Sequence, residues 1–335
     1  MDIFGTIGPA CLEAGTIQKM FEYGMNGMRL NLSHTSLEEA AGMIRAFHKG
    51  ARMAGISHPL LIIDMQGPEM RIGKLKRDLI LEEGETIGLG DQIPVPDPVL
   101  ACLKEGQQIL LDDGKILLEV LEADGPYGPH PCRVLRGGIL TSKKSIAVSG
   151  EKNTAPVLTD QDMNNLRSAR DYGVTGIMQP FVRSRKDLLS VRSAMEETGC
   201  PDLKLYAKIE NLEGVRCLPD FMELADEIVI ARGDLGNSMP LWRLPAVQKQ
   251  LSDYCTKKDK PFMVVTQMLA SMEESPVPTR AEVSDIFHAV LDGAGSLMVT
   301  GETATGCYPE EVIRYLASTA MEAEKYIKKK DLLFN

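Results

Sequence analysis

Charged side chains stand at the ends of two short apolar runs of this sequence, where their types and spacing could support chemistry on an anionic substrate. Lys208 and Glu210 are two residues apart, so on an extended strand they point to the same side. Asp234 follows the next apolar run, and carboxylates from two neighbouring strands can reach one hard divalent cation such as Mg²⁺. A lysine beside such an ion neutralises charge that develops on a phosphoryl oxygen or an enolate. An ion pair at a strand end is the competing interpretation, and it would be preferred for an isolated Lys-x-Glu.

Other polar residues follow further apolar runs and extend this set. The segment 231–236, ARGDLG, places two glycines around Asp234, which would let backbone N–H groups approach a carboxylate ligand. Taken alone, that segment is explained more simply as an ordinary strand-to-helix turn. The remaining members supply cations for an anionic substrate, oxygen ligands and hydroxyls for proton handling: Arg29, Asn31, Ser33, Asp64, Arg71, Thr266, Thr300 and Glu302.

Short apolar runs alternate with longer segments of helical periodicity along most of the chain. Eight such strand-then-helix units favour a closed (β/α)₈ TIM barrel over an open sheet, and polar residues at the C-terminal strand ends of such a barrel converge on one mouth. The predicted strands are Ile3–Ile7, Gly27–Leu30, Leu60–Asp64, Val174–Gln179, Leu203–Lys208, Glu227–Ala231, Phe262–Thr266 and Ser296–Val299. The predicted helices include Ser36–Met53, Asp160–Tyr172, Arg185–Thr198, Leu244–Lys257, Ala281–Asp292 and Pro309–Lys328.

A Gly- and Pro-rich segment from about residue 72 to residue 152 interrupts this alternation. It predicts a small all-β lid domain inserted after the third barrel strand, where a long excursion can close over a site. We therefore expect barrel residues 1–72, an inserted domain at 73–152, and barrel residues 153–335. The β-type runs within the insertion are Leu79–Leu81, Gln108–Leu111, Ile116–Leu121 and Arg133–Leu135.

Composition argues against several classes of protein. The net charge of −10 disfavours a nucleic-acid or anionic-membrane partner, since both need an excess of Lys and Arg. The seven cysteines contain no C-x-x-C pair, which disfavours a disulfide framework or a zinc site and favours a cytoplasmic location. No apolar stretch approaches the length of a membrane span, and the N-terminus lacks the features of a secretory signal. His48, His58 and His130 show no partner pattern and are expected at the surface.

Together, the motifs resemble those of the pyruvate kinase family in residue identity, order and spacing over nearly the whole chain. The resemblance implies an enzyme that transfers the phosphoryl group of phosphoenolpyruvate to ADP or another nucleoside diphosphate, giving pyruvate and ATP. The matching segments are Thr6–Ala10, Arg29–His34, Asp64 with Gly67–Arg71, Lys208–Asn211 with Glu213–Val215, Ala231–Gly236, Thr266–Leu269 with Ser271 and Met272, Pro278–Asp285, and Gly301–Ala304 with Tyr308 and Pro309.

The resemblance also implies a role for each matching residue. Magnesium or manganese would be held by Glu210 and Asp234, and potassium by Asn31, Ser33, Asp64 and the main-chain carbonyl of Met65. Glu69 matches the glutamate that accompanies potassium dependence. Phosphoenolpyruvate would contact Arg29, Lys208, Gly233, Asp234 and Thr266, and the nucleotide would contact Thr6, Pro9, Asn31, His34, Arg71 and Lys144. In catalysis, Arg29 and Lys208 would bind the transferring group, Lys208 would stabilise the enolate, and Thr266, Thr300 and Glu302 would support proton transfer.

Several positions depart from the family pattern. Met65 and Gln66 stand where Thr-Lys is usual, which removes a positive charge but keeps the backbone carbonyl. Thr300 replaces a serine, and the segment 145–150 differs from the usual return strand of the lid. The sequence reaches only to the end of the eighth barrel helix, so the resemblance predicts that the C-terminal regulatory domain and its effector response are absent. Substitutions near residues 237–240 and at Val277 fall in a region that resembles the barrel-to-barrel interface, so a homodimer through the barrel stays open.

Two other functions remain open. One is a related enzyme of a specialised pathway that uses phosphoenolpyruvate or a related enolate with a different phosphoryl partner, motivated by Gln66 and the missing regulatory domain. The other is a non-catalytic ligand sensor. A sensor would not need the complete lysine and carboxylate set, so it ranks last.

Overall fold

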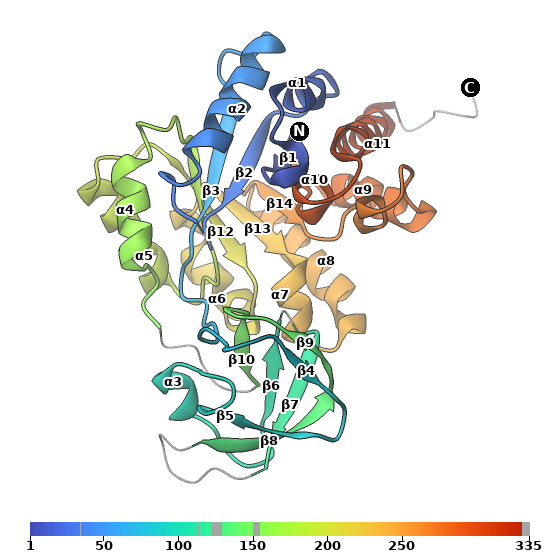
Figure 1. Ribbon diagram of the computed structural model, residues 1–335. Coiled ribbons are helices and arrows are strands. Elements are labelled where there is room, and N and C mark those ends of the chain that lie inside the picture. Colours follow the sequence, from blue (N-terminus) through green and yellow to red (C-terminus); the bar gives the residue numbers. More distant parts are fainter. Residues whose placement is uncertain (34, 113, 122–128, 150–154, 330–335) are drawn as a thin grey trace. The chain divides into compact units, whose positions relative to one another are not determined.

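The computed structural model describes the whole chain except residues 34, 113, 122–128, 150–154 and 330–335 (Figure 1). Eight parallel strands close a barrel in the order β1-β15-β14-β13-β12-β11-β3-β2. The eight predicted strands are therefore confirmed, and so is the TIM-barrel fold class. The barrel strands are β1 (Asp2–Thr6), β2 (Gly27–Asn31), β3 (Leu60–Asp64), β11 (Gly176–Gln179), β12 (Lys204–Ile209), β13 (Glu227–Ala231), β14 (Phe262–Val265) and β15 (Ser296–Met298).

Helices surround the barrel strands (Figure 1). Their apolar faces pack on the outward-facing side chains of the strands in one large core. They are η1 (Pro9–Cys11), α1 (Ala14–Glu22), α2 (Ala41–Met53), α4 (Asp160–Ser168), α5 (Arg185–Glu197), α6 (Leu212–Phe221), η2 (Met222–Leu224), α7 (Arg232–Asn237), η3 (Leu241–Arg243), α8 (Leu244–Lys257), η4 (Ala270–Glu273), α9 (Arg280–Leu291), α10 (Gly301–Ala304) and α11 (Pro309–Lys329).

The barrel interior is filled by side chains, many of which form one apolar cluster. The barrel is therefore a packed core rather than a channel. At the N-terminal end, the buried Glu227 accepts a hydrogen bond from the hydroxyl of Ser296. Burial raises the pKa of Glu227 above its ordinary value, against the effect of that hydrogen bond. Alternation along β12 then brings Lys208 to the C-terminal end, two residues beyond the interior Tyr206.

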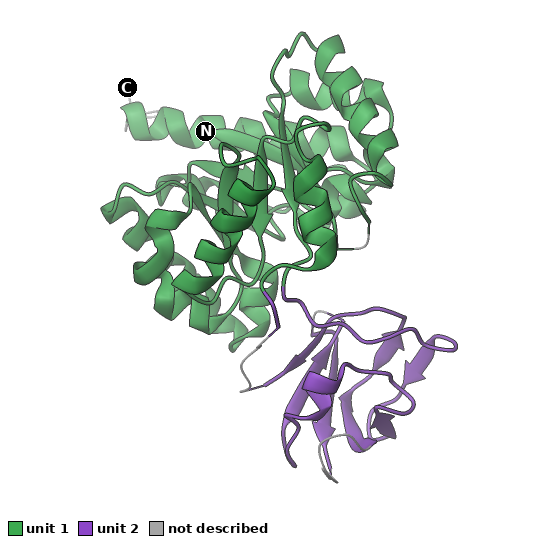
Figure 2. Cartoon of the chain, turned by 90° about the vertical axis from the view of Figure 1, so that its left-hand side faces the viewer, with its two compact units in different colours: residues 1–67, 157–335 green, residues 68–156 purple. Residues whose placement is uncertain are grey.

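Residues 68–156 form a second compact unit, which follows β3 in the chain (Figure 2). It has its own apolar core, built from alternate residues on one face of each inserted strand. A five-stranded antiparallel sheet has the order β10-β6-β7-β8-β5, and β4 pairs with β9 in a two-stranded ribbon. The elements are β4 (Leu79–Leu81), β5 (Thr86–Leu89), α3 (Asp97–Leu100), β6 (Gln108–Leu111), β7 (Ile116–Val120), β8 (His130–Arg136), β9 (Gly138–Leu140) and β10 (Ile146–Val148).

Some local expectations were wrong. His130 is fully buried in the second unit rather than exposed. The helix predicted from Ser36 begins at Ala41, and the helix predicted to reach Tyr172 ends at Ser168. Within the described part of the chain, no helix is both long and apolar enough to cross a membrane.

Candidate functional site

A charged cluster lies at the C-terminal ends of β2, β3 and β12. Asp64, only 2% exposed, accepts bonds at Oδ2 from Arg29 Nε at 2.8 Å and Nη2 at 2.7 Å. Lys208 Nζ lies 3.0 Å from the same oxygen. The strand register explains why Lys208 lies next to Asp64. Side chains alternate between the inside and the outside of the barrel along each strand, and β11 lies between β12 and β3. Two cations thus share one buried carboxylate.

Glu210 completes a balance of charge within this cluster. Its Oε1 lies 2.9 Å from Lys208 Nζ, and its Oε2 accepts a hydrogen bond from the backbone N–H of Phe181 at 2.8 Å. Glu210 is 3% exposed, and Phe181 holds a left-handed backbone with φ of 51°. Two carboxylates therefore face two cations, which is the arrangement that makes buried charges tolerable.

The pKa values of Asp64 and Lys208 follow from this balance. Burial alone would raise the pKa of Asp64, but the charges of Lys208 and Arg29 outweigh it and hold the pKa below its ordinary 3.8. Burial alone would lower the pKa of Lys208, but Asp64 and Glu210 outweigh it and raise the pKa above its ordinary 10.5. Both groups are charged at neutral pH, so an anionic ligand at this end meets an ammonium that stays protonated.

Glu210 and Asp234 fit the requirements of a magnesium site. They follow the neighbouring strands β12 and β13, and Asp234 lies half-buried in the first turn of α7. Each oxygen of Glu210 takes part in one polar contact, which leaves further lone pairs for a hard cation. Among the described residues, no group of three or more His, Cys, Asp and Glu side chains forms a metal cluster. Two carboxylates with the remaining positions left to water and substrate suit Mg²⁺.

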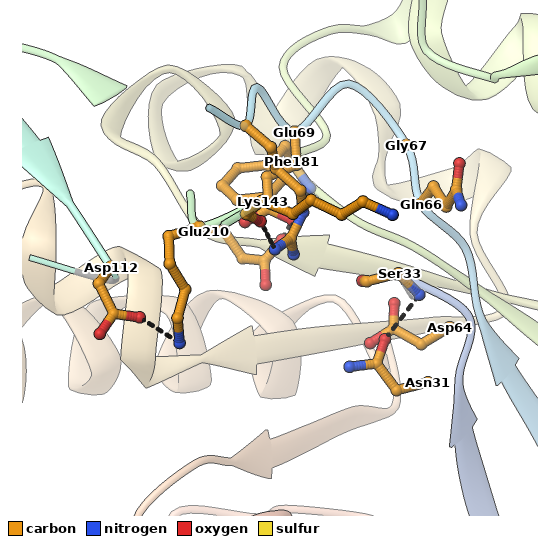
Figure 3. A network of polar contacts seen from close by, with 12 residues as sticks. Asn31, Ser33, Asp64, Gln66, Gly67, Glu69, Asp112, Lys143, Phe181 and Glu210 are labelled. Carbon is orange, nitrogen blue, oxygen red and sulfur yellow. Dashed lines mark hydrogen bonds and ion pairs between the residues drawn. The ribbon is translucent and has the colours of Figure 1, made fainter. Parts of the chain in front are cut away.

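The proposed potassium ligands include a buried carbonyl that has no hydrogen-bond partner among the described residues. Met65 is 1% exposed, and no hydrogen bond between described residues uses its carbonyl. A buried acceptor without a donor is rare and suits a bound cation. Asn31 Oδ1 accepts a bond from the backbone N–H of Ser33 at 3.1 Å (Figure 3), and Asp64 occupies the position paired with Asn31 on β3. The chemistry of these oxygens fits a monovalent cation.

Thr266 sits on a strained backbone that neighbouring side chains hold in place. Thr266 and Gln267 have φ of 83° and 54°, a left-handed region that a β-branched residue rarely adopts. Arg232 donates to the Thr266 carbonyl at 3.0 Å and 2.7 Å, and its Nη1 lies 2.6 Å from Asp285 Oδ2. A Cβ on Gly233 would lie 3.1 Å from Thr266 Cγ2, so glycine permits the close approach. Sequence reasoning missed Arg232, which the ARGDLG motif contained.

Thr300 and Glu302 form a short relay after β15. The backbone N–H of Thr300 donates to Glu302 Oε2 at 2.7 Å, and its hydroxyl does so at 3.2 Å. Leu269 N–H binds the other oxygen at 3.3 Å, and Glu302 is 1% exposed. A hydroxyl and a carboxylate in contact can exchange a proton.

The structure describes some of the residues predicted for the nucleotide. Thr6 is buried and donates its hydroxyl to the Val299 carbonyl at 2.9 Å, whereas Pro9 begins η1 and is exposed. His34 lies outside the described residues.

Arg71 and Lys144 adjoin within the second unit. Arg71 pairs with Glu69 and bonds the Lys143 carbonyl at 3.0 Å, and Ile72 N–H bonds the Lys144 carbonyl at 2.9 Å. Lys144 Nζ lies 2.7 Å from Asp112 Oδ1. Burial would raise the pKa of Asp112, but the bond from Lys144 and the charge of Lys115 outweigh it and lower the pKa. Two cations thus come from adjoining backbone segments.

Comparison with known proteins points the same way as these motifs. The family model described as "Pyruvate kinase, barrel domain" matches residues 1–313. Proteins named pyruvate kinase from Geobacillus stearothermophilus and Bacillus licheniformis are 37% and 36% identical to this chain over 98% of its length. The chain spans 57% and 58% of the length of those two relatives.

Proposed function

Because the chain belongs to the pyruvate kinase family, we propose that it transfers the phosphoryl group of phosphoenolpyruvate to ADP or another nucleoside diphosphate, forming pyruvate and a nucleoside triphosphate. One observation carries the proposal. The Lys208 ammonium is held between the buried carboxylates of Asp64 and Glu210 at the end of the barrel where substrates of such folds bind. That ammonium, with the Arg29 guanidinium, can bind the transferring group and neutralise the enolate oxygen.

The remaining residues supply orientation and protons. Thr300 and Glu302 provide a hydroxyl–carboxylate pair that can deliver a proton towards the methylene carbon of the enolate, which converts it to pyruvate. Thr266 presents its hydroxyl from a backbone fixed by Arg232. Glu210 and Asp234 would hold Mg²⁺ or Mn²⁺, which when bound supplies charge neutralisation at phosphoryl and enolate oxygens. Asn31, Ser33, Asp64 and the Met65 carbonyl would hold K⁺.

In this proposal the second unit serves as the lid. Arg71 and Lys144 would bind the phosphates of the nucleotide, since both are basic and come from adjoining backbone segments. Thr6, Pro9, Asn31 and His34 remain predictions for the rest of the nucleotide.

A turnover assay tests the proposal directly. Pyruvate formation is measured with phosphoenolpyruvate and each nucleoside diphosphate, with and without K⁺. Lys208→Met should lower kcat by about 10²–10³-fold, the usual loss when one group that stabilises developing charge is removed. Lys204→Met, a matched change at the exposed start of the same strand, should retain activity. Full activity in Lys208→Met would contradict the mechanism.

A different phosphoryl partner is the second candidate, and Gln66 favours it. This residue carries no charge where the family usually has lysine, and its Oε1 accepts a bond from the Thr159 hydroxyl at 3.2 Å. Phosphorus NMR of reactions with a panel of acceptors separates the candidates, because nucleoside triphosphate appears only in the first. Binding of phosphoenolpyruvate without any product would instead indicate a sensor.

A further inference from the structure

A buried carboxylate holds the backbone segment that follows β3. Asp162 is fully buried at the third position of α4. Its Oδ1 accepts the N–H of Gln66 at 2.8 Å, and its Oδ2 accepts the N–H groups of Gly67 at 3.1 Å and Thr159 at 2.9 Å. Bonds from backbone N–H to a carboxylate are among the stronger hydrogen bonds in proteins.

Helix capping explains only one of these three bonds. The bond to Thr159, with the return bond from Asp162 N–H to Thr159 Oγ1 at 3.1 Å, forms the capping box of α4. Gln66 and Gly67 lie 96 and 95 positions earlier in the chain and contribute nothing to the helix end. The other two bonds therefore serve to fix the segment 65–67.

Fixing the Gln66 N–H also fixes the Met65 carbonyl. The two groups belong to one planar trans peptide unit, so they point in opposite directions and cannot turn separately. The Met65 carbonyl is the buried acceptor without a partner among the described residues. Without Asp162, that peptide plane could rotate towards whatever donor lies nearest.

Gly67 makes the arrangement sterically feasible. Its φ of 61° lies in the left-handed region, and a Cβ there would stand 2.4 Å from Pro180 Cγ. Only glycine brings its N–H to Asp162 on this path without strain.

We propose that Asp162 is a positioning residue for the monovalent cation: through the amides of Gln66 and Gly67, it orients the Met65 carbonyl as a K⁺ ligand. The inference rests on the potassium site of the proposed function and adds the group that orients its single backbone ligand. Asp162 acts through the peptide and touches neither the ion nor a substrate.

The test measures K⁺ binding in the absence of substrates. The melting temperature of the full chain is followed as KCl replaces choline chloride at constant ionic strength, because an ion that binds only the folded state raises it in a concentration-dependent way. Asp162→Asn exchanges one accepting oxygen for an NH₂ group, so the K⁺ midpoint should rise at least about tenfold, the change that 1.4 kcal/mol produces.

Two controls isolate the backbone effect. Asp187→Asn makes the same change at the third position of α5, where Asp187 accepts the Arg183 N–H at 3.0 Å and, within the described part of the chain, forms no hydrogen bond with the segment 65–67. Gln66→Ala removes the side chain and keeps the backbone N–H. Both variants should keep the wild-type midpoint within about twofold, a difference well under 1 kcal/mol.

Each outcome decides the inference. A wild-type midpoint in Asp162→Asn would overturn it. If that variant does not fold, Gly67→Ala keeps the helix cap and displaces the Gly67 N–H, and a wild-type midpoint there would overturn the inference equally. Absence of any K⁺-specific stabilisation in the wild type would overturn the potassium site itself, whereas phosphoryl transfer is judged separately by the pyruvate assay.

Discussion

Arg29 and Lys208 both form ion pairs with Asp64, and these two positive charges lower the pKa of its carboxyl group. Its pKa lies below the ordinary 3.8, so its ion pairs add to the free energy of unfolding at pH values above 3.8. The contribution is lost as the pH falls through the lower, folded-state pKa. The ion pairs of Asp64 at the C-terminal end of the barrel therefore make part of its stability sensitive to acid.

Asp64→Asn should destabilise the chain most at neutral pH. Removing one partner of a buried ion pair leaves uncompensated charge and costs about 3–5 kcal/mol. As the pH falls below 3.8, Asp64 takes up a proton in the unfolded wild-type chain before it does so in the folded one, so the difference in stability between the two proteins should shrink. Urea unfolding at pH 7 and at pH 3 checks this; a difference that stays constant would show that the pairing adds nothing.

Arg232 holds the strained backbone at Thr266 through two hydrogen bonds to its carbonyl. Arg232→Lys loses the fork that binds the Thr266 carbonyl, so strain of about 1–3 kcal/mol at Thr266 is no longer opposed. We expect kcat to fall by about tenfold with little change in melting temperature, since 1.4 kcal/mol is a factor of ten. Arg280→Lys, at the exposed start of α9, is the matched control. Equal kinetics in the two variants would contradict a positioning role.

Contacts between elements decide which site residues the sequence can reveal. The pair Lys208 and Glu210 is predictable because a period of two places both on one side of a strand. The partner of Lys208 at Asp64 lies 144 positions away and depends on barrel closure. Asp162 appears in the sequence only as an acid in the first turn of a helix, and nothing local indicates its bonds to Gln66 and Gly67. The contact between Lys208 and Glu210 is thus predictable from the sequence, whereas the contacts that depend on distant elements are not.

Element boundaries were predicted less well than the elements themselves. Ser36 and Glu39 bond each other's N–H groups at 3.0 Å and 3.1 Å in the reciprocal pattern of a capping box, but this pattern begins only a turn at residues 37–40, and α2 starts at Ala41. His130 was missed although its alternation with Cys132 and Val134 along β8 places all three on the buried face. That period-two signal would have identified it. The strands succeeded because each is a short apolar run, as in Leu60–Asp64.

Asn211 caps the N-terminus of α6. This helix follows the strand that carries Lys208 and Glu210, and Asn211 Oδ1 accepts the Gly214 N–H at 2.7 Å at its start. Asn211→Ala should cost about 1 kcal/mol. In a protein of this size that lowers the melting temperature by about 1–2 °C, measurable by calorimetry. Asn211→Asp keeps the acceptor and should melt like the wild type; a loss as large as that of alanine would rule out capping as the cause.

At the scale of the whole molecule, the two units carry separate parts of the proposed reaction. Arg29, Lys208 and Glu302 belong to the barrel unit, and Arg71 and Lys144 belong to the unit formed by residues 68–156. The two barrel segments on either side of the insertion lie close together, because the N–H groups of residues 66, 67 and 159 all donate to the carboxylate of Asp162. A short linker can therefore join them.

Replacing residues 68–156 by a short Gly-Ser linker should leave the barrel folded and abolish transfer to nucleotide. Exchange of the pyruvate methyl protons with deuterated solvent, the reverse of enolate protonation, should persist because its residues remain. Proton NMR follows this exchange and circular dichroism follows the fold. As a control, Lys208→Met in the shortened chain should stop the exchange. Continued phosphorylation of nucleotide without residues 68–156 would contradict the proposal that nucleotide binding depends on the second unit.

Glu227 is buried at the N-terminal end of the barrel, where Ser296 donates a hydrogen bond to it. Its pKa is shifted in the opposite direction to that of Asp64. Its pKa is raised above 4.5 by burial, so the folded chain loses stability as the pH climbs from 4.5 through that raised value. The contribution of Glu227 to folding stability thus decreases as the pH rises, whereas the contribution of Asp64 decreases as the pH falls. For these two carboxyls alone, the molecule resists unfolding best in the narrow, mildly acidic interval between 3.8 and 4.5.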